Sequence, residues 1–172
     1  MDERAPEVAV QRPPEEAQIL LRQALVEAKR RDLILPECRG SGHAVGQAKV
    51  TQGRGNLAHL GRPKDGPDPS QSLKPVAAAT AEVLGRKVAF AEDCIGASAT
   101  SAISAMSNGD ILCLENTRFH KGEEKNDPAF VAALAANGDI FVNDAFSAAH
   151  RAHASTEGLA HHMPSFAGRT MQ

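Results

Sequence analysis

Downstream of Asn56, short apolar runs alternate with longer amphipathic patterns of helical period. The clearest apolar runs are residues 87–90, 110–114 and 139–142. Runs of this length that are bounded by turn residues are typical of buried strands, and strands that alternate with helices are typical of βα units. The sequence therefore predicts an α/β fold built on a parallel sheet.

Three helices are expected, one before each of these strands, each with recognisable ends. Ser72 can cap the first helix, and Gly85 can end it in a left-handed conformation. The second helix is predicted over residues 97–107. Asp127 followed by proline is typical of an N-cap and a first helical residue, and this third helix should stop at Gly138.

The first 54 residues differ in character from the rest of the chain. A charged amphipathic stretch over residues 15–31 predicts a helix, and a glycine-rich polar run follows it. We therefore divide the chain into an atypical segment, residues 1–54, and a partial α/β domain, residues 55–172.

The composition indicates a soluble globular protein, with 42% hydrophobic and 23% charged residues and a net charge of −2. A mildly acidic chain argues against a general nucleic-acid surface. No apolar run approaches the roughly 20 residues that cross a bilayer, and the N-terminus lacks the pattern of a secretory signal, so we expect a cytoplasmic protein without a membrane partner. Three widely spaced cysteines, Cys38, Cys94 and Cys113, indicate buried or incidental thiols.

Arginine and histidine gather just after the expected strands. His59 and Arg62 follow one short apolar run, Arg118 follows the second long run, and His150 with Arg151 follows the third. Ligands of open parallel sheets bind beyond the carboxyl ends of the strands. The planar guanidinium donates paired hydrogen bonds to phosphate or carboxylate and stays charged. Together these residues predict a site for a small polyanion, although each one alone is more often a solvated charge or a hydrogen-bonded histidine.

Other motifs point away from further chemistry. No Walker loop and no GxGxxG that opens a helix is present. His150 and His153 fit no zinc spacing with cysteine and no HExxH pattern, so no metal site is expected. The charged run at residues 123–127 is interpreted as a solvated loop that ends in a helix cap, without a catalytic role.

Five longer motifs, in order, resemble signatures of the phosphoglycerate kinase family, and they extend over residues 59–156. The motifs are HLGRPK (59–64), SLKPVA (72–77), EDCIG (92–96), LENTRFHKGEEKNDP (114–128) and VNDAFSAAHRAHAST (142–156). The resemblance implies the substrate-binding N-terminal domain of that family. The fold implied is an incomplete three-layer, Rossmann-like parallel sheet with helices on both faces.

In that family, phosphoryl transfer links 1,3-bisphosphoglycerate and ADP with 3-phosphoglycerate and ATP in glycolysis. The resemblance implies direct in-line transfer in a cytoplasmic monomer. MgADP or MgATP would be bound by a C-terminal domain, and no metal by this chain. Carried over by motif, the substrate-binding residues are His59, Leu60, Gly61, Arg62, Arg118, His150 and Arg151. No catalytic residue is assigned, because the family's transition-state arginine has no counterpart in residues 1–54.

The chain also departs from the family at both ends. The RVDxN strand of the family is absent from residues 1–54, and a reading-frame shift upstream of Asn56 is one hypothesis for its loss. Without that strand we expect an uncovered sheet edge. The sequence stops at Gln172, where the family continues into its nucleotide domain. We therefore expect a fragment that does not turn over alone.

Three alternatives remain open at the level of sequence. The chain could be a stand-alone anion-binding module without catalysis, or a non-functional gene product. An unrelated metal-dependent hydrolase would require His150 and His153 to converge with a carboxylate on one ion.

Overall fold

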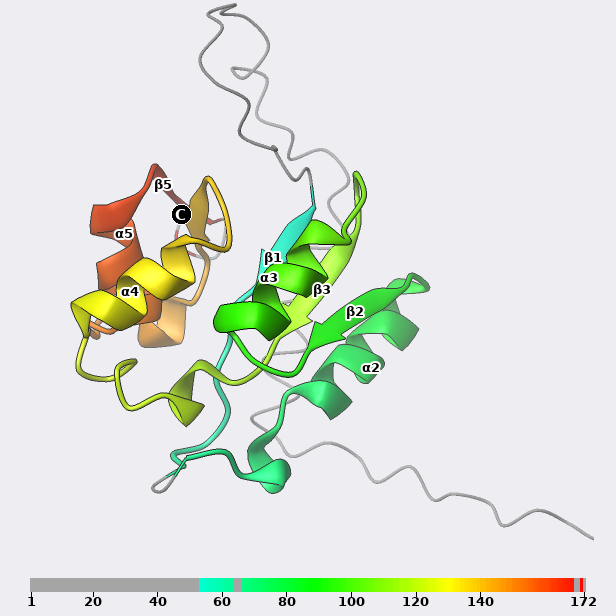
Figure 1. Cartoon of the computed structure of the whole chain (residues 1–172), viewed down its shortest axis with the longest axis horizontal. Helices are drawn as coiled ribbons and strands as arrows, with labels where there is room; N and C mark the ends of the chain where they lie inside the picture. Colours follow the sequence, from blue (N-terminus) through cyan, green and yellow to red (C-terminus); the bar gives the residue numbers. More distant parts are fainter. Residues whose placement is uncertain (1–52, 64–65, 169–170, 172) are drawn as a thin grey trace, which may run out of the picture.

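The computed structural model describes residues 53–63, 66–168 and 171 (Figure 1). The helix predicted over residues 15–31 lies outside these residues. The described part contains a three-stranded sheet, a separate two-stranded sheet and the helices that pack on them.

The three-stranded sheet is parallel and has the order β1-β3-β2. Its strands are β1 (Arg54–Asn56), β2 (Val88–Ala91) and β3 (Ile111–Leu114). All four residues of the central strand β3 are buried, as expected for a strand covered on both faces. The second sheet pairs β4 (Phe141–Asn143) with β5 (Ser165–Ala167), also in parallel. The predicted α/β fold is therefore confirmed.

The predicted strands lie within two residues of their observed bounds. The sequence indicated only the tail of a strand at residues 56–58, whereas β1 is Arg54–Asn56 and pairs with Ile111–Cys113 of β3. Because β1 covers one side of β3 and β2 the other, β3 has no open edge. Within the described residues, β1 and β2 are the two edge strands of this sheet.

Helices cover both faces of the sheet. Leu112 belongs to a core cluster that contains Ala99 of α3 (Gly96–Ser104). Cys113, the next residue, belongs to a second cluster with Val76 of α2 (Lys74–Leu84). Because successive side chains of a strand point to opposite faces, α2 and α3 lie on opposite sides of the sheet. The predicted three-layer arrangement is confirmed.

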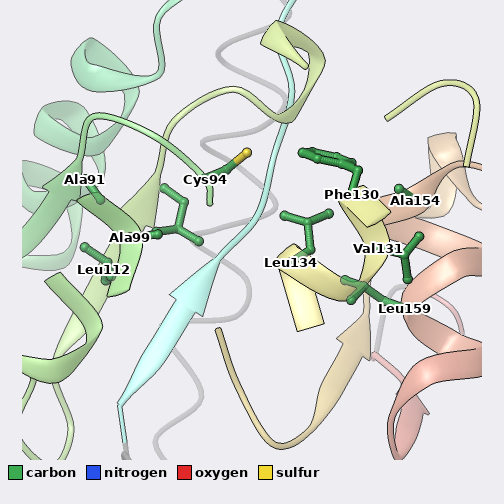
Figure 2. Close-up of a cluster of buried hydrophobic side chains, with 10 residues drawn as sticks. Ala91, Cys94, Ala99, Leu112, Phe130, Val131, Leu134, Ala154 and Leu159 are labelled. Carbon is green, nitrogen blue, oxygen red and sulfur yellow. The ribbon is translucent and has the colours of Figure 1, made fainter. Parts of the chain in front are cut away.

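The larger cluster also joins the sheet to the C-terminal helices (Figure 2). Phe130 and Leu134 of α4 (Pro128–Ala135) face the sheet side of this cluster, and Leu159 of α5 (Leu159–His162) packs behind them. A π-helical turn, η5 (Ala154–Gly158), leads directly into α5. Three short 3₁₀ turns complete the described elements: η2 (Pro69–Gln71), η3 (Thr117–Phe119) and η4 (Phe146–Ala148).

The predicted helix ends are largely confirmed. The Oδ1 atom of Asp127 accepts hydrogen bonds from the amides of Ala129 and Phe130, both at 3.0 Å. Gly85 ends α2 with a φ of 58° in the left-handed region. Helix α3 ends at Ser104, earlier than predicted, because a separate turn closed by Asp110 follows it.

Helix α2 has a more elaborate start than the sequence indicated. The Ser72 hydroxyl accepts from the Lys74 amide at 3.2 Å and donates to Glu115 at 2.6 Å. The other carboxylate oxygen of Glu115 accepts from the Leu73 amide at 2.8 Å. A buried carboxylate from the end of β3 therefore satisfies the first turn of a helix more than 40 residues earlier in the chain.

Helices of the described residues are all too short or too polar to cross a membrane. Two of the three cysteines can be placed: Cys94 and Cys113 are free and buried, as predicted, whereas Cys38 lies outside the described part of the chain.

Truncating Leu112 to alanine should lower the free energy of unfolding by about 2–5 kcal/mol, because this side chain is fully buried in the larger cluster. Val83 is 46% exposed on α2, so Val83→Ala is the matched control and should change stability by less than about 0.5 kcal/mol. Urea unfolding followed by circular dichroism measures both. Equal losses in the two variants would contradict the described core.

Candidate anion-binding site

The loops that follow β1, β3 and β4 each carry an arginine. His59 and Arg62 lie just beyond β1, Arg118 lies in the turn η3 beyond β3, and Arg151 follows β4 and η4. We call Arg62, Arg118 and Arg151 the arginine cluster, because the charges of Arg151 and Arg62 both act on Arg118.

Arg118 is the fixed member of the arginine cluster. Its side chain is only 9% exposed, and its Nη1 donates to the carbonyl of Gly61 at 2.7 Å. Its Nε lies 3.4 Å from the carboxylate of Glu124. Burial lowers the pKa of Arg118, Glu124 opposes this, and the charges of Arg151 and Arg62 lower the pKa further. The charges of Arg62 and Arg151 are thus close enough to Arg118 to repel it.

Arg62 and Arg151 are the open members of the cluster. Arg62 is exposed and Arg151 is half-buried, and among the described residues neither side chain forms a hydrogen bond or an ion pair. A group of like charges in which only one member has a counter-ion is electrostatically unfavourable. An anion bound between the guanidinium groups would remove this repulsion.

The pKa of His59 is also affected by the nearby positive charges. Its side chain is half-buried, and burial is the largest cause that lowers its pKa to about 4, followed by Arg118, His153 and Arg151. His59 is therefore neutral near pH 7 and can donate one hydrogen bond to a ligand without adding a further repelling charge. A bound anion would raise the pKa of His59.

The structure separates His150 from His153, of which the sequence assigned only His150 to the site. His150, which the motif assigned to the site, is exposed, and it is not among the groups that act on His59. His153 is buried and lowers the pKa of His59, so His153 lies nearer the arginine cluster. The sequence did not assign His153 to the site, although it stands two positions after Arg151. The direction in which this loop turns cannot be predicted from the sequence.

Leu60 and Gly61 act through the main chain. The Leu60 side chain packs in the smaller core cluster, and its carbonyl accepts from Asn116. Gly61 has a φ of 63°, and a Cβ there would collide with the side chain of Gln71. The backbone angle favours glycine at this position, and any larger residue would also displace the Gln71 side chain.

Asn116 joins the loops that carry the cluster. It is fully buried, and its Nδ2 donates to the carbonyls of Leu60 at 2.8 Å and Gln71 at 2.9 Å. Its Oδ1 accepts from the Arg118 amide at 3.0 Å. The sequence placed Asn116 beside the site but did not predict this bridging role, because it depends on contacts more than 40 residues apart.

Glu123 corrects one prediction. The run at residues 123–127 was interpreted as a solvated loop, but the Glu123 side chain is fully buried. Its carboxylate accepts from the amide and the hydroxyl of Ser155, and its carbonyl accepts from the Ala154 amide at 2.9 Å. Burial raises the pKa of Glu123, while the Ser155 donors and the charges of His153 and Arg118 lower it. Glu123 therefore holds the start of η5, next to the loop of Arg151, against the loop of Arg118.

The sequence model of phosphoglycerate kinase matches residues 56–172. The chain belongs to the phosphoglycerate kinase family. The phosphoglycerate kinase of Mesorhizobium japonicum is 74% identical over 116 residues, which are 67% of this chain and 29% of that protein. The phosphoglycerate kinase of Methylorubrum extorquens strain PA1 is 56% identical over 148 residues, 86% of this chain and 36% of that protein, so this alignment extends upstream of Asn56.

Solved structures of the family share the fold. The phosphoglycerate kinase of Coxiella burnetii superposes with a TM-score of 0.59 at 38% identity, over 67% of this chain and 28% of that one. The enzyme of Pyrococcus horikoshii gives a TM-score of 0.60 at 29% identity, over 68% and 30% of the two chains. The chain thus spans about a third or less of the length of these relatives.

Replacing Asn116 with alanine should lower the free energy of unfolding by about 2–4 kcal/mol, because two buried carbonyls lose their donor. Asn108 is exposed, so Asn108→Ala is the matched control. Urea unfolding measures the difference, and an Asn116 variant as stable as the control would contradict the bridging role.

Acid should destabilise the chain partly through His59. Its pKa is lower in the folded state than in the unfolded state, so the unfolded chain binds the extra proton, and stability is lost as pH falls from 6.5 to about 4. After allowance for partial solvent exposure, this contribution is about 1–2 kcal/mol.

His59→Gln should remove this part of the acid dependence, and urea unfolding across that pH window tests it. His150→Gln controls for the loss of an exposed imidazole. A stability difference between wild type and His59→Gln that stays constant with pH would show that His59 does not titrate as described.

Proposed function

We propose that residues 55–172 form the part of a phosphoglycerate kinase that binds 3-phosphoglycerate and 1,3-bisphosphoglycerate, and that residues 1–54 are a separate segment. The observation that carries the proposal is the arginine cluster, in which Arg62 and Arg151 have no partner among the described residues. 3-Phosphoglycerate carries a phosphate and a carboxylate at opposite ends. Guanidinium groups bind both anions through paired hydrogen bonds.

Each residue has a distinct part in this proposal. The guanidinium of Arg118 is already oriented before the ligand binds, because it contacts Gly61 and Glu124. Arg62 and Arg151 close on the ligand from two other loops, and neutral His59 donates a hydrogen bond. Leu60 and Gly61 shape the loop, His150 stands at the rim, and His153 joins the set on the strength of its charge coupling to His59.

The whole protein would transfer a phosphoryl group between 1,3-bisphosphoglycerate and ADP in glycolysis, as a cytoplasmic monomer. MgADP or MgATP would be the co-substrate and would be held by a second domain. In such direct transfer, catalysis comes from positioning and from stabilisation of charge. The arginine cluster would supply the positioning of the glycerate substrate, and no covalent intermediate on this chain is required.

Thermal unfolding with and without 3-phosphoglycerate tests the binding step. Ligand at about 100 times its dissociation constant should stabilise the folded chain by about 2.7 kcal/mol. Arg151→Met should reduce this stabilisation strongly without harming the fold, because the Arg151 side chain makes no hydrogen bond among the described residues. Arg86→Met is the matched control, since Arg86 lies before β2, at the opposite end of the strands.

Glycerate, which lacks the phosphate, is the control ligand and should stabilise the chain less. A cooperative transition that 3-phosphoglycerate does not move would contradict the proposed site. Equal loss of stabilisation in Arg86→Met and Arg151→Met would show that the effect is general charge rather than the cluster.

A further inference from the structure

Three side chains of different chemistry meet outside the arginine cluster. Asp93 and Cys94 follow β2, and His120 follows β3. A carboxylate oxygen, the thiol sulfur and an imidazole nitrogen of these residues all lie within 4.8 Å of one another. We propose that Asp93, Cys94 and His120 bind one zinc ion, with solvent in the fourth position.

The donor set fits zinc. Zinc takes thiolate, imidazole and carboxylate ligands in tetrahedral sites, and sites with three protein ligands leave one position open. Metal–ligand bonds of about 2.0–2.3 Å place the donor atoms roughly 3.5 Å apart. The Asp93–His120 contact, now 2.7 Å, would open slightly, and Cys94 Sγ would move inward by up to about 1.3 Å.

Neighbouring residues already orient the three side chains. The His120 ring stacks on Phe130, with centroids 5.1 Å apart and an interplanar angle of 28°. Asp93 Oδ1 accepts from the Cys94 amide at 2.6 Å. The Cys94 carbonyl accepts from Asn137 at 2.7 Å. Supporting contacts of this kind fix ligand geometry in metal sites.

The Cys94 sulfur lies beside a pair that can form without an ion. Asp93 and His120 contact each other at 2.7 Å, and, after burial, a side-chain hydrogen bond to Asp93 is among the causes that raise the pKa of the Cys94 thiol. Figure 2 shows the sulfur pointing out of the core cluster on the side of Phe130, on which His120 stacks. The thiol sulfur of Cys94 therefore lies beside the Asp93–His120 pair as the third metal-ligand atom of the proposed site.

Access and charge also favour a cation at this place. The side chains of His120 and Asp93 are 30% and 42% exposed, while Cys94 is fully buried behind them. Burial raises the pKa of the Cys94 thiol, and the carboxylates of Asp93 and Glu123 raise it further. The surroundings are therefore negative, and a divalent cation would displace the thiol proton to solvent as the zinc–sulfur bond forms.

Zinc here would tie the loop after β2 to the loop that carries Arg118. Its predicted role is structural support, and the proposal stands independently of substrate binding. Zinc should therefore raise the midpoint of thermal unfolding of the full chain in proportion to its affinity.

Cobalt titration of the reduced, metal-free full chain tests the site directly, because cobalt replaces zinc and gives a thiolate-to-metal absorption band. We expect the band to grow to one equivalent and to disappear on addition of zinc. Cys94→Ser should abolish it. Cys113→Ser removes the other buried thiol, and Cys38→Ser the remaining one, and both should keep the band.

Asp93→Asn is the sharpest ligand variant, because the amide oxygen can still accept from the Cys94 amide while the anion is lost. It should weaken cobalt binding at least tenfold. Cys94→Ala replaces Cys94→Ser if circular dichroism shows that serine is not tolerated in the core. No band in the wild-type chain, or an equal band in the folded Cys94 variant, would overturn the proposal.

Discussion

The polar residues that follow β3 hold the rest of the structure in register. Glu115, Asn116 and Thr117 are buried immediately after a fully buried strand. Burying such groups is costly unless hydrogen bonds satisfy them, and Glu115 and Asn116 satisfy main-chain groups of the α2 start and of the loop after β1. A slip of β3 by one residue would break these bonds and turn Leu112 away from its cluster. The positions of β3, of the start of α2 and of the loop after β1 are therefore specified together.

The hydrogen bonds of Asn116 lead to Arg118, and electrostatic repulsion is concentrated there. The main-chain amide of Arg118 is held by Asn116 and its guanidinium by Gly61, so it cannot turn away from Arg62 and Arg151. Burial lowers the pKa values of Arg118 and His59 most, and this crowding of positive charge lowers them further. Functional sites often carry such unfavourable local charge, which the remaining fold must offset. Under the proposed function, the arginine cluster is positioned before the anion binds.

The sequence predicted those features that depend on local chemistry. Strand positions, the Asp127 cap and the left-handed Gly85 follow from spacing and from the properties of single residues. The burial of Glu123 could not be predicted, because its partner Ser155 lies 32 residues away in the chain. The choice of His153 over His150 likewise depends on how one loop turns.

The general rule for parallel sheets predicted that the arginine-bearing loops follow strand ends, while the hydrogen bonds between those loops had no signal in a single sequence. Asn116 illustrates the difference, since it stands in a motif just after a predicted strand but its two carbonyl partners could not be predicted.

The central claim is that loops from three strands form one anion site. A ¹H–¹⁵N correlation spectrum of the full chain, titrated with 3-phosphoglycerate, tests this most directly. We expect amide shifts that saturate together and are confined to residues 59–62, 117–118 and 151–153. Shifts in only one of these loops, or shifts spread evenly over the chain, would contradict a single site built from all three.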